Sequence, residues 1–127
     1  MAKRIGKILI VEDDRAISRA MEFRLKQEGY QLDIAKDGEE ALEKIEASKP
    51  DLILLDLILP KVNGFEVLKS VKSRKETESI DVVIFSNLSQ KEDVQQARDY
   101  GAVEFCVKSD LSTDELANVV NKYFEKN

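Results

Sequence analysis

Acidic side chains follow two apolar runs of this sequence, at the places where buried strands would end. Glu12 and Asp13 come directly after the run 8–11, and Asp56 comes directly after the run 52–55. A carboxylate beside a buried strand is costly to remove from water unless something there uses its charge. If both runs are strands of one sheet, the three carboxylates share a pocket and offer the oxygen ligands that a hard cation prefers.

The cation that these acids favour is Mg²⁺. Three unpaired carboxylates would repel one another, and a divalent cation relieves that repulsion. Mg²⁺ takes one or two carboxylates together with waters and phosphate oxygens, whereas a calcium loop brings more oxygens in a spacing that this sequence lacks. With the cation bound, Asp56 keeps a free oxygen that can attack phosphorus as a nucleophile.

A hydroxyl and an ammonium group stand at the ends of two further apolar runs. The run 82–86 ends in Ser86 and is followed by Asn87, and the run 103–107 is followed by Lys108. Phosphoryl transfer depends on positioning and on neutralising the charge of the phosphoryl oxygens. Mg²⁺ would hold one of these oxygens, Lys108 another, and the Ser86 hydroxyl with the Asn87 N–H a third.

Five apolar runs alternate with amphipathic segments along the chain. Strict alternation predicts a parallel sheet with helices on both faces, a doubly wound α/β sandwich of the (βα)5 kind. The flavodoxin-like strand order 2-1-3-4-5 places the first and third strands side by side, and ligands bind at the carboxyl ends of strands beside that reversal. The predicted strands are residues 7–11, 31–35, 52–56, 82–86 and 103–107.

Helix-start and helix-stop signals agree with this pattern. Capping-box spacings are predicted to begin four helices, and Asp14 is expected to cap the first. Gly29 and Gly101 stand where a left-handed residue is wanted after a helix, and Pro50 follows the second helix. The four capping pairs are Asp37 with Glu40, Asn63 with Glu66, Ser89 with Glu92, and Ser112 with Glu115.

Composition limits the classes of function that the chain can serve. Its 127 residues suffice for one domain, with 25 acids, 20 bases and a formal net charge of -5. That balance disfavours nucleic acid and anionic membranes as partners, and no apolar run has the length of a membrane span.

The single cysteine, Cys106, excludes an internal disulfide, so we expect a cytoplasmic protein. Without histidine, the chain has neither a Ser-His-Asp triad nor a phosphohistidine.

Five of these motifs, taken in order, resemble a response-regulator receiver domain of the CheY-like, stand-alone type. The resemblance spans essentially the whole chain and implies a single receiver domain over residues 1–127, without an output domain, in two-component phosphorelay signalling. It implies a signalling phosphoacceptor that assists its own phosphorylation and dephosphorylation and is not an enzyme. The motifs are Val-Glu-Asp-Asp at 11–14, Asp-Leu-Ile-Leu-Leu-Asp at 51–56, Pro60 with Asn63-Gly64, Ser86, and Lys108.

The resemblance assigns the phosphoryl group and the metal to named residues. It implies that Asp56 accepts phosphate from the phosphohistidine of a sensor histidine kinase or a histidine phosphotransfer protein. Ser86 and Lys108 would contact the phosphoryl group once it is bound. The residues that would hold Mg²⁺ are Glu12, Asp13, Asp56 and Ile58, the last through its backbone carbonyl.

The resemblance also implies a switch. Phe105, three residues before Lys108, matches the family's aromatic switch position and would act together with Ser86. Phosphorylation would draw the hydroxyl towards the phosphate and turn the ring inward, which remodels the face made by the fourth helix, fifth strand and fifth helix. That face would serve protein binding or onward phosphotransfer, towards a target that the sequence does not identify. We expect a monomer, with dimerisation on phosphorylation left open.

Departures from the family's pattern lead to further predictions. Ser109 follows Lys108 where the family usually has a proline in a cis bond; because a non-proline cis bond costs about 3 kcal/mol, we expect a trans peptide here and a rerouted loop. Ile58 and Leu88 are apolar where polar residues could orient a water, which predicts slow autohydrolysis of the phosphorylated form. Asn87 is bulkier than the residue often found there, which predicts slow phosphorylation.

Three other functions compete with this interpretation. A pseudo-receiver, which binds proteins independently of phosphorylation, is disfavoured by the full acceptor set but left open by Ser109 and the crowded rim. An aspartate-nucleophile phosphatase of the haloacid dehalogenase kind needs a second acid two residues after the nucleophile, where Ile58 stands. A flavin-binding flavodoxin needs a Ser/Thr/Gly-rich phosphate loop after the first strand, and the sequence has none.

Overall fold

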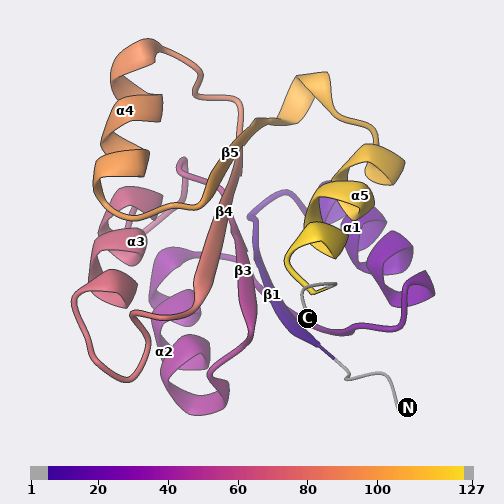
Figure 1. Ribbon diagram of the computed structural model, residues 1–127, viewed down its shortest axis with the longest axis horizontal. Helices are drawn as coiled ribbons and strands as arrows, with labels where there is room; N and C mark the ends of the chain where they lie inside the picture. The colour runs from indigo at the N-terminus through magenta and orange to yellow at the C-terminus, as the bar shows by residue number, and fades with distance from the viewer. Residues whose placement is uncertain (1–5, 125–127) are drawn as a thin grey trace.

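The chain folds into five βα units in sequence, as a computed structural model describing residues 6–124 shows (Figure 1). Residues 1–5 and 125–127 of the predicted domain lie outside the described residues. The strands are β1 (Lys7–Val11), β2 (Gln31–Ala35), β3 (Leu52–Leu55), β4 (Asp81–Ser86) and β5 (Glu104–Val107). The helices are α1 (Arg15–Gln27), α2 (Gly38–Ser48), α3 (Gly64–Lys72), α4 (Lys91–Asp99) and α5 (Thr113–Lys122).

The sheet is parallel and has the strand order β2-β1-β3-β4-β5, which confirms the predicted reversal between the first and third strands. The ladder between β1 and β3 runs from Ile8 opposite Leu52 to Val11 opposite Leu55. These two strands therefore end level with each other. The acids that follow them begin at the same edge of the sheet.

Helices cover both faces of the sheet and divide the core into two clusters (Figure 1). Successive residues of a strand point to opposite faces. Leu9 and Val11 accordingly pack in the cluster under α2, α3 and α4, while Ile8 and Ile10 pack in the cluster under α1 and α5. Residues 8–11 of β1 and all of β3 are buried on both faces, which explains why these runs are apolar without alternation.

Helix starts follow the predicted caps with one exception. Helix α4 begins at Lys91 with Gln90 as its N-cap residue, so the predicted Ser89 cap is wrong. The N–H of Val94 donates to the Gln90 carbonyl at 3.1 Å, and the first helical turn therefore closes one residue later than the capping-box spacing implied. The side chains that do accept a hydrogen bond from the first turn are those of Asp14, Asp37, Asn63 and Ser112.

The segment after β5 takes the expected trans path. No cis peptide bond occurs among residues 6–124, so the Lys108–Ser109 bond is trans. Residues Lys108–Asp110 form a single 3₁₀ turn that leads towards α5. Gly29 and Gly101 have φ of 97° and 106°, as expected for residues that follow helices. In the described part of the chain, no helix combines the length and apolar character needed to cross a bilayer.

Candidate functional site

The backbone of the sheet fixes the positions of the two buried acids. The Asp56 N–H donates to the Val11 carbonyl at 3.0 Å, which extends the β1–β3 pairing by one residue. The Glu12 N–H donates to the Ala35 carbonyl at 3.0 Å on the other side of β1. Both carboxylates therefore start from main chain held by neighbouring strands. Their placement follows from the strand order, as the sequence predicted.

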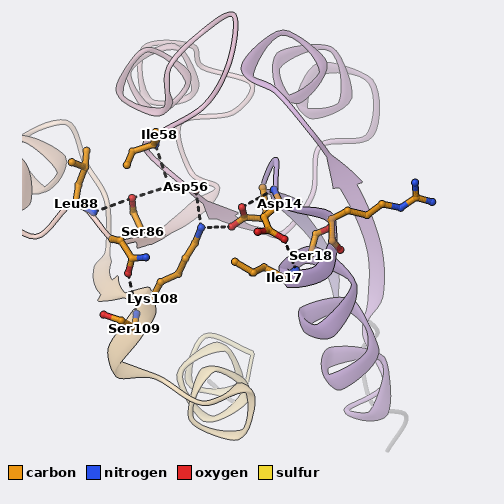
Figure 2. Close-up of polar contacts among 12 residues, drawn as sticks. Asp14, Ile17, Ser18, Asp56, Ile58, Ser86, Leu88, Lys108 and Ser109 are labelled. Carbon is orange, nitrogen blue, oxygen red and sulfur yellow. Dashed lines mark hydrogen bonds and ion pairs between the residues drawn. The ribbon is translucent and has the colours of Figure 1, made fainter.

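The Asp56 carboxylate is held at both oxygens (Figure 2). The Ser86 hydroxyl donates to Oδ1 at 2.7 Å, and the Ile58 N–H donates to the same oxygen at 3.1 Å. Lys108 Nζ donates to Oδ2 at 2.8 Å. Asp56 is 4% exposed and Ser86 is fully buried, so these bonds act with little competition from water.

Lys108 bridges the two buried acids. Its Nζ lies 2.6 Å from Glu12 Oε1 as well as 2.8 Å from Asp56 Oδ2. Burial acts to lower the pKa of Lys108, but the hydrogen bonds and negative charges of Asp56 and Glu12 outweigh that effect and raise it. The ammonium group is consequently held charged at neutral pH, where it balances part of the negative charge of the site.

Glu12 is the most buried acid of the cluster, and Lys108 balances its negative charge only in part. Burial raises the pKa of Glu12, although Lys108 and the Asp14 N–H, which donates to Oε2 at 3.0 Å, act to lower it. Glu12 Oε1 is buried and is paired with Lys108 Nζ at 2.6 Å, but Glu12 shares this one cation with Asp56. A second cation beside Glu12 would relieve the remaining cost of burial.

The three predicted metal-binding acids meet in one place. One carboxylate oxygen from each of Glu12, Asp13 and Asp56 lies within 4.8 Å of the others. Asp13 is exposed, so the cluster opens to solvent on its side. Three carboxylates balanced by one lysine leave an all-oxygen set with net negative charge, which fits a hard divalent cation such as Mg²⁺. Asp14 is no part of this cluster, because its side chain caps α1 by accepting from Ile17.

The comparisons with known proteins agree with this geometry. Residues 8–121 match the family model of the response regulator receiver domain. The chain belongs to this family. It is similar to the response regulator ArlR of Staphylococcus saprophyticus, with 40% identity over 102 residues, covering 80% of this chain and 45% of the relative. The chain spans less than half the length of the curated relatives it matches.

Solved receiver domains share the whole fold with this one. A CheY-like receiver domain protein from Methanospirillum hungatei superposes with a TM-score of 0.89 at 26% identity, covering 96% of this chain and 95% of that one. The Mn²⁺-bound form of response regulator Rcp1 superposes with a TM-score of 0.84 at 29% identity, covering 96% of each chain. The flavodoxin-like architecture is therefore the architecture of the family.

The rim of the receiver site is apolar, as its sequence predicted. Ile58 is 56% exposed and its N–H, not its carbonyl, is the group that contacts Asp56. The role of the Ile58 carbonyl as a metal ligand stays a prediction. Leu88 is half-buried, and its N–H lies 3.4 Å from Ser86 Oγ. Phe105 of β5 lies opposite Ile84 of β4. It packs against the core cluster under α2, α3 and α4.

Sequence reasoning missed several backbone and glycine contributions to this receiver site. A Cβ on Gly64 would lie 2.4 Å from both the Asp56 carbonyl oxygen and Leu57 Cα, so glycine lets α3 begin against the backbone at Asp56 and Leu57. The Asn63-Gly64 pair was a signal for that close approach. The N–H donors of Ile58 and Asp14 had no signal, because every non-proline residue carries an N–H.

Proposed function

We propose that this receiver domain accepts a phosphoryl group on Asp56 from the phosphohistidine of a sensor histidine kinase or a histidine phosphotransfer protein. One observation carries the proposal: a buried carboxylate has both oxygens held, one by Ser86 and the other by Lys108. Membership of the receiver family, whose relatives are named response regulators, supports it. The donor imidazole lies outside these 127 residues, which contain no histidine.

The transfer exchanges one bond to phosphorus for another. An oxygen of Asp56 forms the new P–O bond while the P–N bond of the donor breaks, and its electron pair stays on the imidazole nitrogen, which takes a proton. Lys108 and the Ser86 hydroxyl, which now contact the carboxylate, are placed to move onto phosphoryl oxygens. Such positioning and charge neutralisation account for most of the catalysis of phosphoryl transfer.

The metal of this proposal is Mg²⁺, held by Glu12, Asp13 and Asp56. Their clustered oxygens and the burial of Glu12 support it, and a related receiver structure is described as Mn²⁺-bound. When bound, the cation would neutralise charge on the acids and on the phosphoryl oxygens. Glu12 and Asp13 would hold the cation beside Asp56, where it would offset the mutual repulsion of the three carboxylates.

The output of the proposed switch is the face formed by α4, β5 and α5. Ser86 ends β4 beside Val107 of β5, so a shift of the Ser86 hydroxyl towards phosphate is transmitted to the strand that carries Phe105. A half-buried ring on that strand can change its packing at low cost. The altered face would bind a target protein, or the domain would pass its phosphate onward, acting as a monomer in the cytoplasm.

The proposal is tested by the intact mass of the protein after incubation with acetyl phosphate and Mg²⁺. We expect a single added phosphoryl group. It should be absent from Asp56→Asn, which lacks the nucleophilic oxygen, and absent when the metal is chelated. A phosphorylated Asp56→Asn variant would place the acceptor elsewhere. No adduct in any sample, even with rapid quenching, would contradict the phosphoacceptor function and favour a phosphorylation-independent binding module.

A further inference from the structure

The residues that follow Ser86 and Lys108 are joined to each other. The N–H of Ser109 donates to the Oδ1 of Asn87 at 3.0 Å (Figure 2 draws this bond beside Lys108). Paired residues of β4 and β5 end at Ser86 opposite Val107. The Asn87–Ser109 bond lies just beyond that end, so a side chain continues the connection between the two segments where the backbone ladder stops.

The local structure explains why this bond forms. Ser109 lies in the 3₁₀ turn Lys108–Asp110, and the first N–H groups of such a turn have no acceptor within it. Ser109 also has an N–H to donate, which a proline at that position would lack. The Ser109 N–H donates to the side-chain oxygen of Asn87, because this oxygen is the acceptor of the amide group.

The bond joins the two residues that directly follow Ser86 and Lys108, whose side chains contact Asp56. Asn87 is adjacent in sequence to Ser86, which holds Asp56 Oδ1, and Ser109 is adjacent to Lys108, which holds Oδ2. Ser86 is the last residue of β4, and Lys108 is the first residue of the 3₁₀ turn that follows β5. The β4–β5 ladder holds Ser86 beside Val107, and the Asn87–Ser109 bond continues this connection past Lys108, so it constrains the spacing between the hydroxyl and the ammonium group.

We propose that Asn87 is a positioning residue for phosphoryl transfer to Asp56. By accepting the Ser109 N–H, it fixes the spacing between the Ser86 hydroxyl and Lys108 Nζ. This inference rests on the proposed function of Asp56 and adds a residue to that reaction. Preorganised placement of the groups that contact the transferring phosphoryl lowers the barrier, and small misplacements are costly.

Two properties of the Asn87 side chain oppose each other. Its bulk was predicted to slow phosphorylation, whereas its acceptor oxygen is here inferred to speed it. Asn87→Leu separates them, because leucine keeps the bulk and removes the acceptor. Asn87→Asp restores an acceptor oxygen at the same reach. Ser109→Ala is the matched control, because alanine keeps the backbone N–H and loses only the hydroxyl.

The experiment measures the rate constant for phosphorylation at saturating acetyl phosphate with Mg²⁺, together with the donor concentration giving half that rate. We expect Asn87→Leu to lower the saturating rate constant about fivefold, the equivalent of one ordinary hydrogen bond. Ser109→Ala should match the unchanged protein. The saturating rate constant of Asn87→Asp should lie within about twofold of that of the unchanged protein, because the added charge of this variant acts mainly on donor binding.

A second readout follows the bond itself in the unphosphorylated protein. Hydrogen exchange of the amide at position 109, measured by NMR, should accelerate in Asn87→Leu and stay slow in Ser109→Ala and Asn87→Asp. Since Asn87 and Ser109 are exposed, the urea midpoint should change little in any variant, which separates positioning from a general loss of structure.

The outcomes distinguish this inference from the proposed function. Normal phosphorylation of the unchanged protein, with Asn87→Leu equally fast or faster at saturation, would overturn the role of Asn87 alone. A slowed Asn87→Leu with an unaltered amide at position 109 would overturn the link as its cause. An unchanged protein that takes up no phosphate would overturn the proposed function, and the inference would fall with it.

Discussion

Lys108 compensates two buried carboxylates at once, so its removal is expected to cost stability as well as function. Its side chain is 12% exposed, and those of Glu12 and Asp56 are 2% and 5% exposed. Leaving such charges unpaired costs about 3 kcal/mol or more. We predict that Lys108→Ala lowers the free energy of unfolding in urea by about that amount in chelator. Added Mg²⁺ should restore part of the loss, because the cation replaces the missing charge.

A control for this prediction is Lys122, an exposed lysine paired with Glu104. Surface ion pairs contribute about 0–1 kcal/mol, so Lys122→Ala should change the unfolding free energy by less than about 1 kcal/mol. Equal effects of the two substitutions would contradict the compensating role of Lys108. A Lys108→Ala variant that Mg²⁺ fails to stabilise would contradict the metal-binding role of the acidic cluster.

Cys106 is predicted to be unreactive in the folded protein. Burial, and then the charge of Glu104, raise the pKa of its thiol from 9.0 to about 11. The thiolate is the reactive species, so a shift of this size lowers the reactive fraction about 100-fold at pH 8. The rate of reaction with a disulfide reagent at pH 8 should therefore be at least that much slower in the folded state than in urea. Comparable rates would show that the thiol is accessible.

The same shift fixes the sign of a pH effect on stability. Because the folded-state pKa of Cys106 lies above the unfolded value, the thiol favours the folded state below pH 9.0, and this contribution is lost as the pH rises towards about 11. Cys106→Ala should therefore lose less stability than the unchanged protein across that window. Urea unfolding at both ends of the window measures the difference.

At the scale of elements, helix caps give a prediction with an internal control. The side chains of Asn63 and Ser112 accept hydrogen bonds from N–H groups in the first turns of α3 and α5, whereas Gln90 makes no such bond to α4. Substitution of an N-cap acceptor by alanine costs about 1 kcal/mol. We predict that loss for Asn63→Ala and Ser112→Ala, and a change within about 0.5 kcal/mol for Gln90→Ala and Ser89→Ala. A destabilised Ser89→Ala would restore the cap that the capping-box spacing suggested.

Elements were predictable to the extent that their signals are local. Four of the five expected helix caps are present, and each strand lies within one residue of its predicted bounds. The exception is α4, because the loop after Ser86 determines where its first turn closes. The path of that loop depends on β5 and on Ser109, which are distant in sequence. A capping-box spacing concerns neighbouring residues only, so it does not predict such contacts.

At the scale of the whole molecule, the sheet separates two cores that should respond independently. Ile84 packs under α2, α3 and α4, and Ile8 packs under α1 and α5. We predict that Ile84→Val and Ile8→Val each lower the unfolding free energy by about 1 kcal/mol. Because the two sites lie on opposite faces and on strands separated by β3, the double variant should lose the sum within about 0.5 kcal/mol.

Two isoleucines on the same face of the sheet provide the comparison for this prediction. Ile53 and Ile84 belong to the same core cluster on the adjacent strands β3 and β4, so their substitutions share neighbours and should not add. Urea unfolding of the single and double variants measures both pairs. Strong coupling between Ile8 and Ile84 would contradict two independent cores.

The sequence by itself determined the order of the elements and the chemistry at their ends. Apolar periodicity specifies strands and helices because it reflects which face each residue must bury, and that requirement acts within a few residues. Strict alternation then required a parallel sheet with a reversal of order. This order predicts that Glu12, Asp13 and Asp56 meet at one edge of the sheet, with Ser86 and Lys108 beside them.

Only the tertiary structure decided which atoms meet. The Lys108 ammonium bridges Asp56, 52 residues away, and Glu12, and the Asn87 amide reaches the Ser109 N–H across 22 residues. These contacts depend on rotamers and loop paths that are set by packing from many distant residues at once. The space that Gly64 leaves beside Asp56 arises in the same way. No local pattern encodes them, because each is a property of several chain segments together.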